Sequence, residues 1–350
     1  MHELIQRLYA TGSLEQDELK RLIENISGYE EDLFAHARMR QREHYGTAIY
    51  MRGLVEFTNI CQCDCYYCGI RRSNAKAQRY RLDKEQILAA CEMGYAQGYR
   101  TFVLQGGEDP WFTDERICDI VSNLKKRYPD CAVTLSIGEK KRESYQAYYD
   151  AGAERYLLRH ETASKHLYEK LHPPGQTMEN RMRCLSDLKE IGYQVGAGMM
   201  LEAPFQTLDD ILMDLAYLKR LEPDMIGMGP FIHHQDTPFK DYPSGSLEFA
   251  LVMIAVCRLM FPRALIPATT ALGSIDPQGR EKGILAGANV VMPNLSPAAV
   301  KGKYKLYDNK MSIDALAKTG GLNLDGTLGK MGYHTQVSRG DRTGFYERGK

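Results

Sequence analysis

The chain has 350 residues, 43% of them hydrophobic, which is enough for one large domain or two ordinary ones. Its 45 basic and 45 acidic side chains cancel, which argues against the clustered positive charge of a nucleic-acid-binding surface. No apolar run approaches the roughly 18 residues of a membrane span, and the first residues lack the apolar core of a signal peptide. We therefore expect a soluble, cytoplasmic protein with no nucleic-acid or membrane partner.

Four of the nine cysteines fall within residues 61–68, and the other five are scattered singly. Scattered single cysteines are not the pattern of a disulfide framework. This distribution indicates a reducing and anaerobic setting.

The first 46 residues have helical character. Ser13 and Gln16 are spaced as in a capping box, and apolar residues then recur at helical spacing through residues 19–26. A second helical stretch ends at Gly46. Because no residue with obvious chemistry stands out, we expect residues 1–46 to form a helical cap on the main domain.

From residue 47 onward, short β-rich runs alternate with longer helical stretches, which predicts an α/β fold with a parallel sheet. The runs with strand character are residues 54–57, 101–105, 132–136, 155–159, 195–201, 225–229, 265–268 and 290–292. The main helical stretches are residues 84–97, 114–126, 178–190, 208–219 and 247–260.

Eight strands close a (βα)8 TIM barrel, which we predict for residues 47–310. An open doubly wound sheet is the alternative, since sequence patterns do not reveal closure. Residues 311–350 form a C-terminal extension, and from about residue 320 we expect it to be poorly ordered or peripheral.

The cysteine group follows the first predicted strand. Cys61, Cys65 and Cys68 have the spacing C-x3-C-x2-C. Three thiolates so close together can bind three irons of a [4Fe–4S] cluster and leave the fourth iron without a protein ligand. A structural zinc site is the alternative, but zinc needs four ligands, and no second pair follows at zinc-ribbon spacing. Cys63 lies inside the loop and could serve as an alternative cluster ligand.

Polar residues follow two further strands. Gly106 and Gly107 let the backbone approach a ligand closely, and the carboxylate of Glu108 can accept from an ammonium group, although an ordinary turn is also possible. Arg159 and Glu161 are two apart on extended backbone and therefore share a face, unless they form only a structural salt bridge. In a barrel the C-terminal ends of the strands surround one mouth, where these residues would meet.

Other candidate residues lie later in the chain. Arg181 opens a long helix and could bind a carboxylate with two parallel hydrogen bonds. Phe231 and Ile232 offer apolar surface for an adenine ring. Thr269 and Thr270 present two hydroxyls without a neighbouring base, which suits anion or carboxylate binding better than nucleophilic catalysis. Further along, Tyr304 and Tyr307 are candidate lid aromatics.

These motifs resemble those of the radical S-adenosylmethionine (SAM) enzymes, in which SAM chelates the fourth iron of the cluster. Residues 106–108 match the family's GGE-like motif, which receives the amino group of SAM. The segments Leu-Arg-His-Glu-Thr at 158–162 and Pro-Ala-Thr-Thr at 267–270 resemble more narrowly the HydE-type [FeFe]-hydrogenase maturases. Relatives on the same plan include biotin synthase and methylornithine synthase.

The resemblance implies a full TIM barrel, a [4Fe–4S] cluster with three Cys ligands, and reductive cleavage of SAM to a 5′-deoxyadenosyl radical. It implies that Tyr67 and Ser136 help to bind the cofactors. It further implies that Arg155, Thr269 and Thr270 line an internal anion or substrate site.

By the same resemblance, the chain would act in maturation of the di-iron site of the hydrogenase H-cluster, on a small organometallic or amino-acid-derived substrate. Other hydrogenase maturases and an electron donor such as ferredoxin or flavodoxin would be its partners. A mutase similar to methylornithine synthase, a biotin-synthase-like enzyme and an iron–sulfur scaffold without turnover remain alternatives. Residues 201–207 replace a glycine-rich turn of the relatives, so we expect a reshaped loop there.

Overall fold

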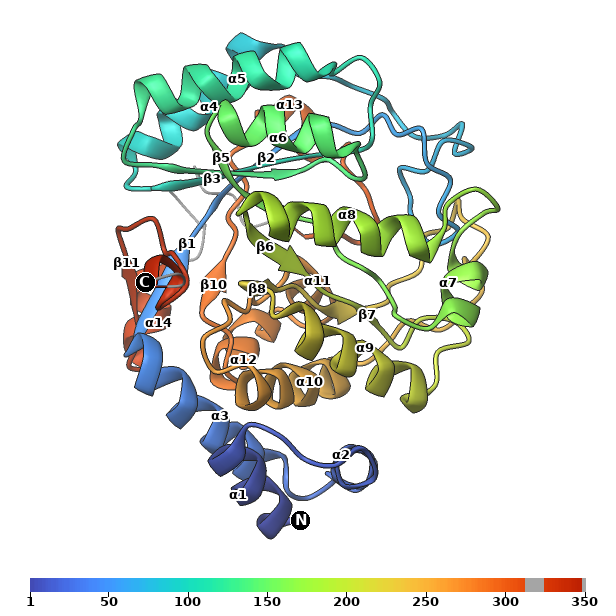
Figure 1. Cartoon of the computed structure of the whole chain (residues 1–350), viewed down its shortest axis with the longest axis vertical. Coiled ribbons are helices and arrows are strands. Elements are labelled where there is room, and N and C mark those ends of the chain that lie inside the picture. The colour runs from blue at the N-terminus through green and yellow to red at the C-terminus, as the bar shows by residue number, and fades with distance from the viewer. Residues whose placement is uncertain (312–323, 348–350) are drawn as a thin grey trace.

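A computed structural model describes residues 1–311 and 324–347, and its centre is a parallel sheet covered by helices (Figure 1). Six strands pair in the order β2-β3-β4-β5-β6-β8. Their bounds are β2 (Gly53–Thr58), β3 (Thr101–Gly106), β4 (Ala132–Ser136), β5 (Ala153–Leu157), β6 (Gln194–Ala197) and β8 (Met225–Ile226). The prediction of an α/β fold with a parallel sheet is therefore confirmed.

Shorter strands extend this sheet. β1 (Ala48–Met51) lies between β10 (Val290–Val291) and β11 (His334–Gln336), and β7 (Met200–Leu201) pairs with β9 (Gly229–Pro230). Single parallel bridges join Met225 to Leu265, Pro267 to Val290, and Leu54 to Asn294. Pairing thus continues from β8 through residues 265–267 to β10 and on to β2. Residues 265–268 were predicted to form a strand, but only isolated bridges are found there.

Two predicted strands are each divided in two. Residues 195–201 contain β6 and β7, and residues 225–229 contain β8 and the start of β9. Gly198 separates the first pair with a φ of 153°, and a Cβ there would lie 1.7 Å from the carbonyl oxygen of Gly227. This close backbone approach requires glycine and interrupts the ladder.

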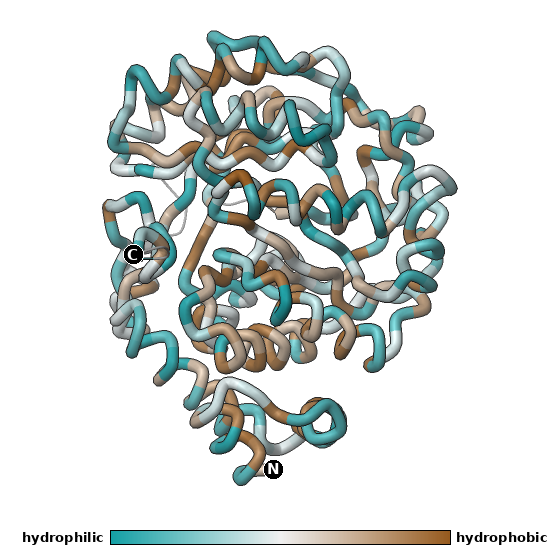
Figure 2. Tube along the Cα trace, viewed as in Figure 1, coloured by the Kyte–Doolittle hydropathy of each residue, from teal (hydrophilic) through white to brown (hydrophobic). Residues whose placement is uncertain are grey.

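The predicted helices are confirmed within one or two residues at each end, as α4 (Lys84–Ala96), α5 (Asp114–Arg127), α8 (Met178–Ile191), α9 (Leu208–Leu221) and α10 (Leu247–Met260). Side chains of Asp83, Thr177, Thr207 and Ser246 accept hydrogen bonds at the starts of four of them, which explains where these helices begin. Shorter helices are α6 (Arg142–Asp150), α7 (Lys165–Leu171), α11 (Thr270–Ile275), α12 (Gly279–Leu285) and α13 (Ala298–Lys301). Nearly all of α10 is buried, and Figure 2 shows its hydrophobic residues in brown.

The N-terminal helices α1 (His2–Thr11), α2 (Gln16–Glu24) and α3 (Glu30–Tyr45) project from one end of the molecule (Figure 1). The predicted capping box at Ser13 and Gln16 is wrong. Helix α2 begins at Gln16, and Glu15 and Glu18 form its capping box. Ser13 instead accepts a hydrogen bond from the Lys219 side chain.

The described part of the C-terminal extension consists of α14 (Leu324–Lys330), β11 and a short 3-10 helix (Phe345–Glu347). β11 pairs with β1, and the carbonyl of Arg339 accepts from Thr101 at the start of β3. Residues 324–347 therefore pair with the sheet at its edge, and residues 312–323 lie outside the described residues. Within the described ranges, no helix is long and apolar enough to cross a bilayer.

Candidate active site at the C-terminal ends of the strands

A cavity of about 340 Å³ lies beyond the C-terminal ends of β2 to β5, and we call it the mouth cavity. Every predicted site residue except Arg155 lines it. These residues are Cys61, Cys65, Tyr67, Cys68, Gly106, Gly107, Glu108, Ser136, Arg159, Glu161, Arg181, Phe231, Ile232, Thr269, Thr270, Tyr304 and Tyr307. The chain order spreads them over more than 240 positions, so their assembly around one cavity is a property of the fold.

The cysteine loop leaves the end of β2 and folds over the glycine-rich loop. The Cys61 sulfur accepts a hydrogen bond from the Glu108 amide at 3.3 Å. A Cβ on Gly107 would lie 2.3 Å from the Ile60 carbonyl oxygen and 2.7 Å from the Cys61 Cβ. Only glycine at position 107 permits this close contact, so the packing of the cysteine loop depends on the glycine-rich loop.

The cysteine thiols differ in their electrostatic surroundings. A hydrogen bond from the Cys63 thiol lowers the pKa of Cys61, and the same bond raises the pKa of Cys63. Burial raises the pKa of Cys65 to about 11 and raises that of Cys68 still further above its usual value. Buried thiols of this kind need a bound cation to become thiolates at neutral pH, which fits a metal cluster.

The cysteines do not converge on a point. Among the described residues, no three His, Cys, Asp or Glu side chains are placed to hold a single metal ion. A cubane cluster does not require such convergence, because each thiolate binds a different iron. The arrangement therefore suits a cluster better than the zinc alternative, which needs four closely placed ligands.

Arginines fix the shape of the cysteine loop. Arg79 donates to the backbone carbonyls of Asn59, Ile70, Arg71 and Asn74, so one side chain gathers both ends of the loop.

The glycine-rich loop is fixed in a similar way. Arg81 pairs with Asp109 at 2.6 Å between Nε and Oδ2, and Asp109 also accepts from Thr58. The chain thus holds both loops in place through its own hydrogen bonds.

Two glutamates of the mouth cavity, Glu108 and Glu161, lie in the segments that follow β3 and β5. Oε1 of Glu108 accepts from the backbone amide of Glu139 at 2.8 Å. Glu161 has a φ of 66°, which is uncommon for a residue other than glycine and is typical of strained functional positions. Its Oε2 accepts from Arg159 Nη2 at 2.8 Å. Arg159 and Glu161 thus contact each other as predicted, although the backbone at Glu161 is not extended as that prediction assumed.

Arg181 is buried at the start of α8. Its Nε donates to Glu139 Oε1 at 2.5 Å and its Nη1 donates to the Arg159 carbonyl at 2.6 Å. Glu139 is a residue that the sequence reasoning missed, although it follows closely on the end of the third predicted strand.

Tyr67 lines the mouth cavity as Arg181 does, and its hydroxyl lies 3.2 Å from His172 Nε2. Burial lowers the pKa of His172 to about 3, so the imidazole is neutral. Its Nδ1 faces the Tyr168 carbonyl at 3.0 Å, which leaves Nε2 to accept from Tyr67. The Tyr67 hydroxyl is therefore oriented by a neutral histidine.

Another part of the cavity wall carries hydroxyl groups. The Oγ1 of Thr269 is buried and has no hydrogen-bond partner among the described residues. Burial raises the pKa of Tyr304 well above its usual value and raises that of Tyr307 to about 12, so both phenols remain protonated. An unpaired buried hydroxyl is costly unless a ligand or water completes it.

Two charged residues of this wall were missed from the sequence. Glu56 on β2 and Lys310 form an ion pair inside the cavity lining, and Asn294 also donates to Glu56 at 2.9 Å. An acidic residue within the apolar run 54–57 is a signal that could have identified Glu56. Nothing in the sequence around Lys310 distinguishes it from a surface lysine.

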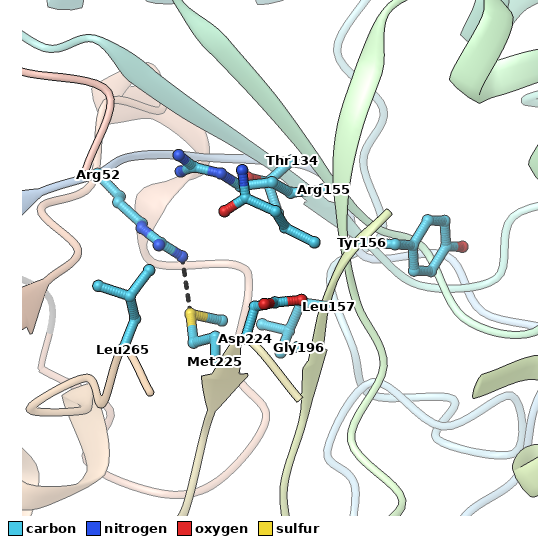
Figure 3. A pocket seen from close by; sticks show the side chains of 10 residues that line it. Arg52, Thr134, Arg155, Tyr156, Leu157, Gly196, Asp224, Met225 and Leu265 are labelled. Atoms are coloured by element: carbon cyan, nitrogen blue, oxygen red, sulfur yellow. Dashed lines mark hydrogen bonds between the residues drawn. The ribbon is translucent and has the colours of Figure 1, made fainter. Parts of the chain in front are cut away.

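Arg155 is placed elsewhere, which corrects its predicted grouping with Thr269 and Thr270. It lines a smaller cavity of about 10 Å³, the floor cavity, together with Arg52, Thr134 and Asp224 (Figure 3). Leu157 and Met225 line both cavities. The Arg155 guanidinium pairs with Asp341 of the C-terminal segment at 2.7 Å.

Arg52 lies beside it and donates to the sulfur of Met225. Its Nε and Nη2 have no hydrogen-bond partner among the described residues. The floor cavity therefore contains two buried guanidiniums. Arg155 has a carboxylate partner, whereas Arg52 has none within hydrogen-bonding distance among the described residues.

Comparison with known proteins adds the family. The model of the radical SAM superfamily matches residues 55–218. The chain is 45% identical over 289 residues to the [FeFe] hydrogenase maturase subunit HydE of Thermotoga maritima, covering 83% of this chain and 82% of that protein. It is 30% identical over 281 residues to 3-methylornithine synthase of Methanosarcina acetivorans, covering 79% of each.

Solved structures agree on the fold. A crystal structure of methylornithine synthase (PylB) matches with a TM-score of 0.82 at 24% identity, over 98% of this chain and 99% of that one. A structure of HydG, a maturase of the [FeFe]-hydrogenase, matches with a TM-score of 0.79 at 21% identity, over 99% and 77%. With the cysteine loop, the glycine-rich loop and the sequence relatives in agreement, the chain belongs to the radical SAM superfamily, where it is close to the HydE maturases.

Proposed function

We propose that this chain is a radical SAM maturase that acts in assembly of the di-iron site of [FeFe]-hydrogenase. The 45% identity to HydE over most of both chains carries this proposal. Membership of the superfamily implies a [4Fe–4S] cluster and SAM, which together supply reductive cleavage of SAM to a 5′-deoxyadenosyl radical.

The proposed cluster ligands are Cys61, Cys65 and Cys68. Their thiols line the mouth cavity, and the two buried ones need a cation to ionise. The Cys63 thiol instead forms a hydrogen bond that lowers the pKa of Cys61, which supports a role beside the ligands and not as one of them.

The residues proposed to bind SAM line the mouth cavity at the ends of β3 and β4, in the segments after β3, β5 and β9, and on α8. Glu108 and Glu161 offer carboxylates to an ammonium or ribose hydroxyl, and Phe231 and Ile232 offer apolar surface to an adenine ring. Arg181 holds Glu139 and the Arg159 carbonyl, so we propose that it positions this wall.

The proposed substrate end of the cavity contains Thr269, Thr270, Tyr304 and Tyr307. The unpartnered hydroxyl of Thr269 supports this assignment, because a bound ligand would complete its hydrogen bonding. In the alternative, both threonines would hydrogen-bond only to nearby backbone groups, but this does not account for the unpaired Oγ1 of Thr269.

For Arg155 we propose a small-anion site in the floor cavity, shared with Arg52. The unpaired Nε and Nη2 of Arg52 support it, and a volume near 10 Å³ admits a species no larger than water or a monatomic ion. A substrate of several atoms does not fit there.

We also propose that the strands form the complete (βα)8 barrel. The bridges at Leu265, Pro267 and Asn294 support this view, because they link β8, β10 and β2 around the ring.

For partners, we propose other hydrogenase maturases, of which HydG is a structural neighbour, and a low-potential electron donor such as ferredoxin or flavodoxin.

A mutase similar to methylornithine synthase is the second candidate, favoured by 30% identity over 79% of the chain. The deciding experiment reconstitutes the protein anaerobically and measures 5′-deoxyadenosine formation and then activation of a hydrogenase lacking its own maturase. Both should occur. Formation of 5′-deoxyadenosine without hydrogenase activation would favour the mutase. The absence of both would favour an iron–sulfur scaffold without turnover.

A further inference from the structure

A buried pair of ionisable residues, His160 and Asp214, lies beside the segment that carries Arg159 and Glu161. Both members of the pair are 0% exposed, and Asp214 comes from the middle of α9. Neither lines the mouth cavity or the floor cavity. The pair can therefore act on a ligand only through other residues.

The pair is tied to the backbone around Glu161. The Nδ1 of His160 accepts from the Gly198 amide at 3.3 Å, and the carbonyl of Gly198 accepts from the Glu161 amide at 3.1 Å. Oδ1 of Asp214 accepts from the amide of Ala163, two residues after Glu161. The peptide that faces Glu161 and the chain that follows it are thus both fixed by the pair.

The carboxylate of Asp214 also determines the tautomer of His160. Because Nδ1 accepts a hydrogen bond, the proton of the neutral ring is on Nε2, and Nε2 lies 3.3 Å from Asp214 Oδ1. The ring of Tyr217 packs on the imidazole with 5.0 Å between the centroids. Asp214 therefore favours the one tautomer in which His160 can hold the Gly198 amide.

Stability alone is a poor reason for this pair. Burial raises the pKa of the Asp214 carboxyl, and across residues 1–311 and 324–347 no lysine or arginine pairs with it. A buried carboxylate without a strong cation costs free energy that two apolar side chains would not. Glu161, in contrast, has a φ of 66°, a conformation that persists only where the surroundings impose it.

We infer that His160 and Asp214 are positioning residues, which hold Glu161 in its left-handed conformation and so direct its carboxylate toward SAM in the mouth cavity. This inference rests on the proposed function, in which Glu161 binds SAM.

The test measures SAM binding by calorimetry to cluster-loaded protein without a reductant, so that SAM is not consumed. His160→Leu should weaken binding by about 5- to 150-fold, because a left-handed glutamate that is no longer held can relax. Asp214→Asn should weaken it in the same direction, since the imidazole loses the acceptor that fixes its tautomer. The absorption of the cluster should not change in either variant.

A conservative variant and a matched control separate positioning from packing. His160→Asn carries an amide oxygen close to the place of Nδ1, so it should bind SAM more tightly than His160→Leu. Tyr148→Phe is the control, because Tyr148 is fully buried, donates to Asp114 and does not line the mouth cavity. It should lower the melting temperature and leave SAM binding unchanged.

A double variant shows whether the pair acts through Glu161. Once Glu161→Gln has removed the carboxylate, adding His160→Leu should cause little further loss of SAM affinity, whereas independent sites would give losses that multiply. If His160→Leu does not fold, Asp214→Asn replaces it in the same comparison.

Three results would overturn the inference: unchanged SAM affinity in both His160→Leu and Asp214→Asn, losses that multiply with that of Glu161→Gln, or an equal loss in Tyr148→Phe. Normal SAM binding by Glu161→Gln would remove both this inference and the assignment of Glu161 to SAM. Activation of hydrogenase by the unmodified protein is measured separately, so the proposed function can stand when the positioning role fails.

Discussion

The floor cavity and the mouth cavity differ in how their polar side chains are paired and in how much space they leave. In the floor cavity, the charge of Arg155 is met by Asp341, a residue of the chain itself, and about 10 Å³ remains. In the mouth cavity, Thr269 keeps an unpartnered hydroxyl and about 340 Å³ remains. The fold therefore supplies the counter-charge of Arg155 and leaves almost no space in the floor cavity, whereas the mouth cavity keeps an unpaired hydroxyl and enough space for a ligand.

The contrast shows that a buried arginine on a central strand does not by itself mark a substrate site. What matters is whether the protein supplies the counter-charge and how much space is left. The following substitutions test this division, beginning with the largest expected effect.

Alanine at Cys61, Cys65 or Cys68 should abolish the cluster, whereas Cys63→Ala should retain it. Each of the three proposed ligands binds its own iron, and the cubane is lost when one is removed. Iron content and the visible absorption of anaerobically reconstituted protein measure this. If Cys63→Ala contained no iron while Cys61→Ala kept a full cluster, the assignment of the ligands would be wrong.

Asp341→Asn should lower the free energy of unfolding by about 3–5 kcal/mol, because it leaves Arg155 charged and buried without its carboxylate. Asp209→Asn is the control, since Asp209 pairs with Lys20 at the surface and should contribute less than about 1 kcal/mol. Urea titration gives both values. Equal losses in the two variants would mean that the floor pair is no more important than a surface pair.

Glu161→Gln should weaken SAM binding by about 10- to 150-fold, which corresponds to a lost charge-assisted hydrogen bond of about 1.5–3 kcal/mol. The absorption of the cluster should not change, because Glu161 is not among the proposed iron ligands. We expect Arg181→Met to act in the same direction by releasing Glu139. Dissociation constants within two-fold of the unmodified protein would place SAM elsewhere.

Because His172 is buried in its neutral form, the free energy of unfolding should decrease as the pH falls below 6.5. The unfolded chain then protonates this imidazole, whereas the folded chain keeps it neutral until pH about 3. The loss should be up to about 1.4 kcal/mol per pH unit. His172→Phe preserves the ring stacked on Tyr168, so it should unfold with a flatter dependence between pH 6.5 and 5.5. Identical slopes would indicate that His172 is already protonated in the fold.

Thr269→Val should slow hydrogenase activation by about 2- to 12-fold, the loss of one neutral hydrogen bond of about 0.5–1.5 kcal/mol. Adding Thr270→Val should increase the loss. Because neither hydroxyl is assigned to SAM, slow cleavage of SAM without substrate should continue in the double variant. Normal activation, or loss of that background cleavage, would remove the threonines from the substrate end.

Much of this fold could be predicted because its periodicity is local. The strands and long helices follow from apolar spacing and from caps such as Ser246, and the cysteine loop follows from its own spacing. The break at Gly198 could not be predicted, because it depends on the carbonyl of Gly227 on a neighbouring strand.

The candidate site was predictable where its residues follow strands in recognisable motifs, as Glu108 and Glu161 do. The pairing of Arg155 with Asp341 could not be predicted, because Asp341 lies far away in a segment without a motif. Lys310 was missed for the same reason, since only the fold brings it to Glu56.

The pairing of β11 with β1 also has a consequence for biosynthesis. These are the first and the last strands along the described chain, so β1 leaves the ribosome with one edge unpaired until His334–Gln336 has been made. Exposed strand edges favour aggregation, and long-range pairing is slow. Every residue that lines the mouth cavity lies at or before Lys310, and has therefore been translated by then. The residues of the mouth cavity can consequently come together before β11 pairs with β1.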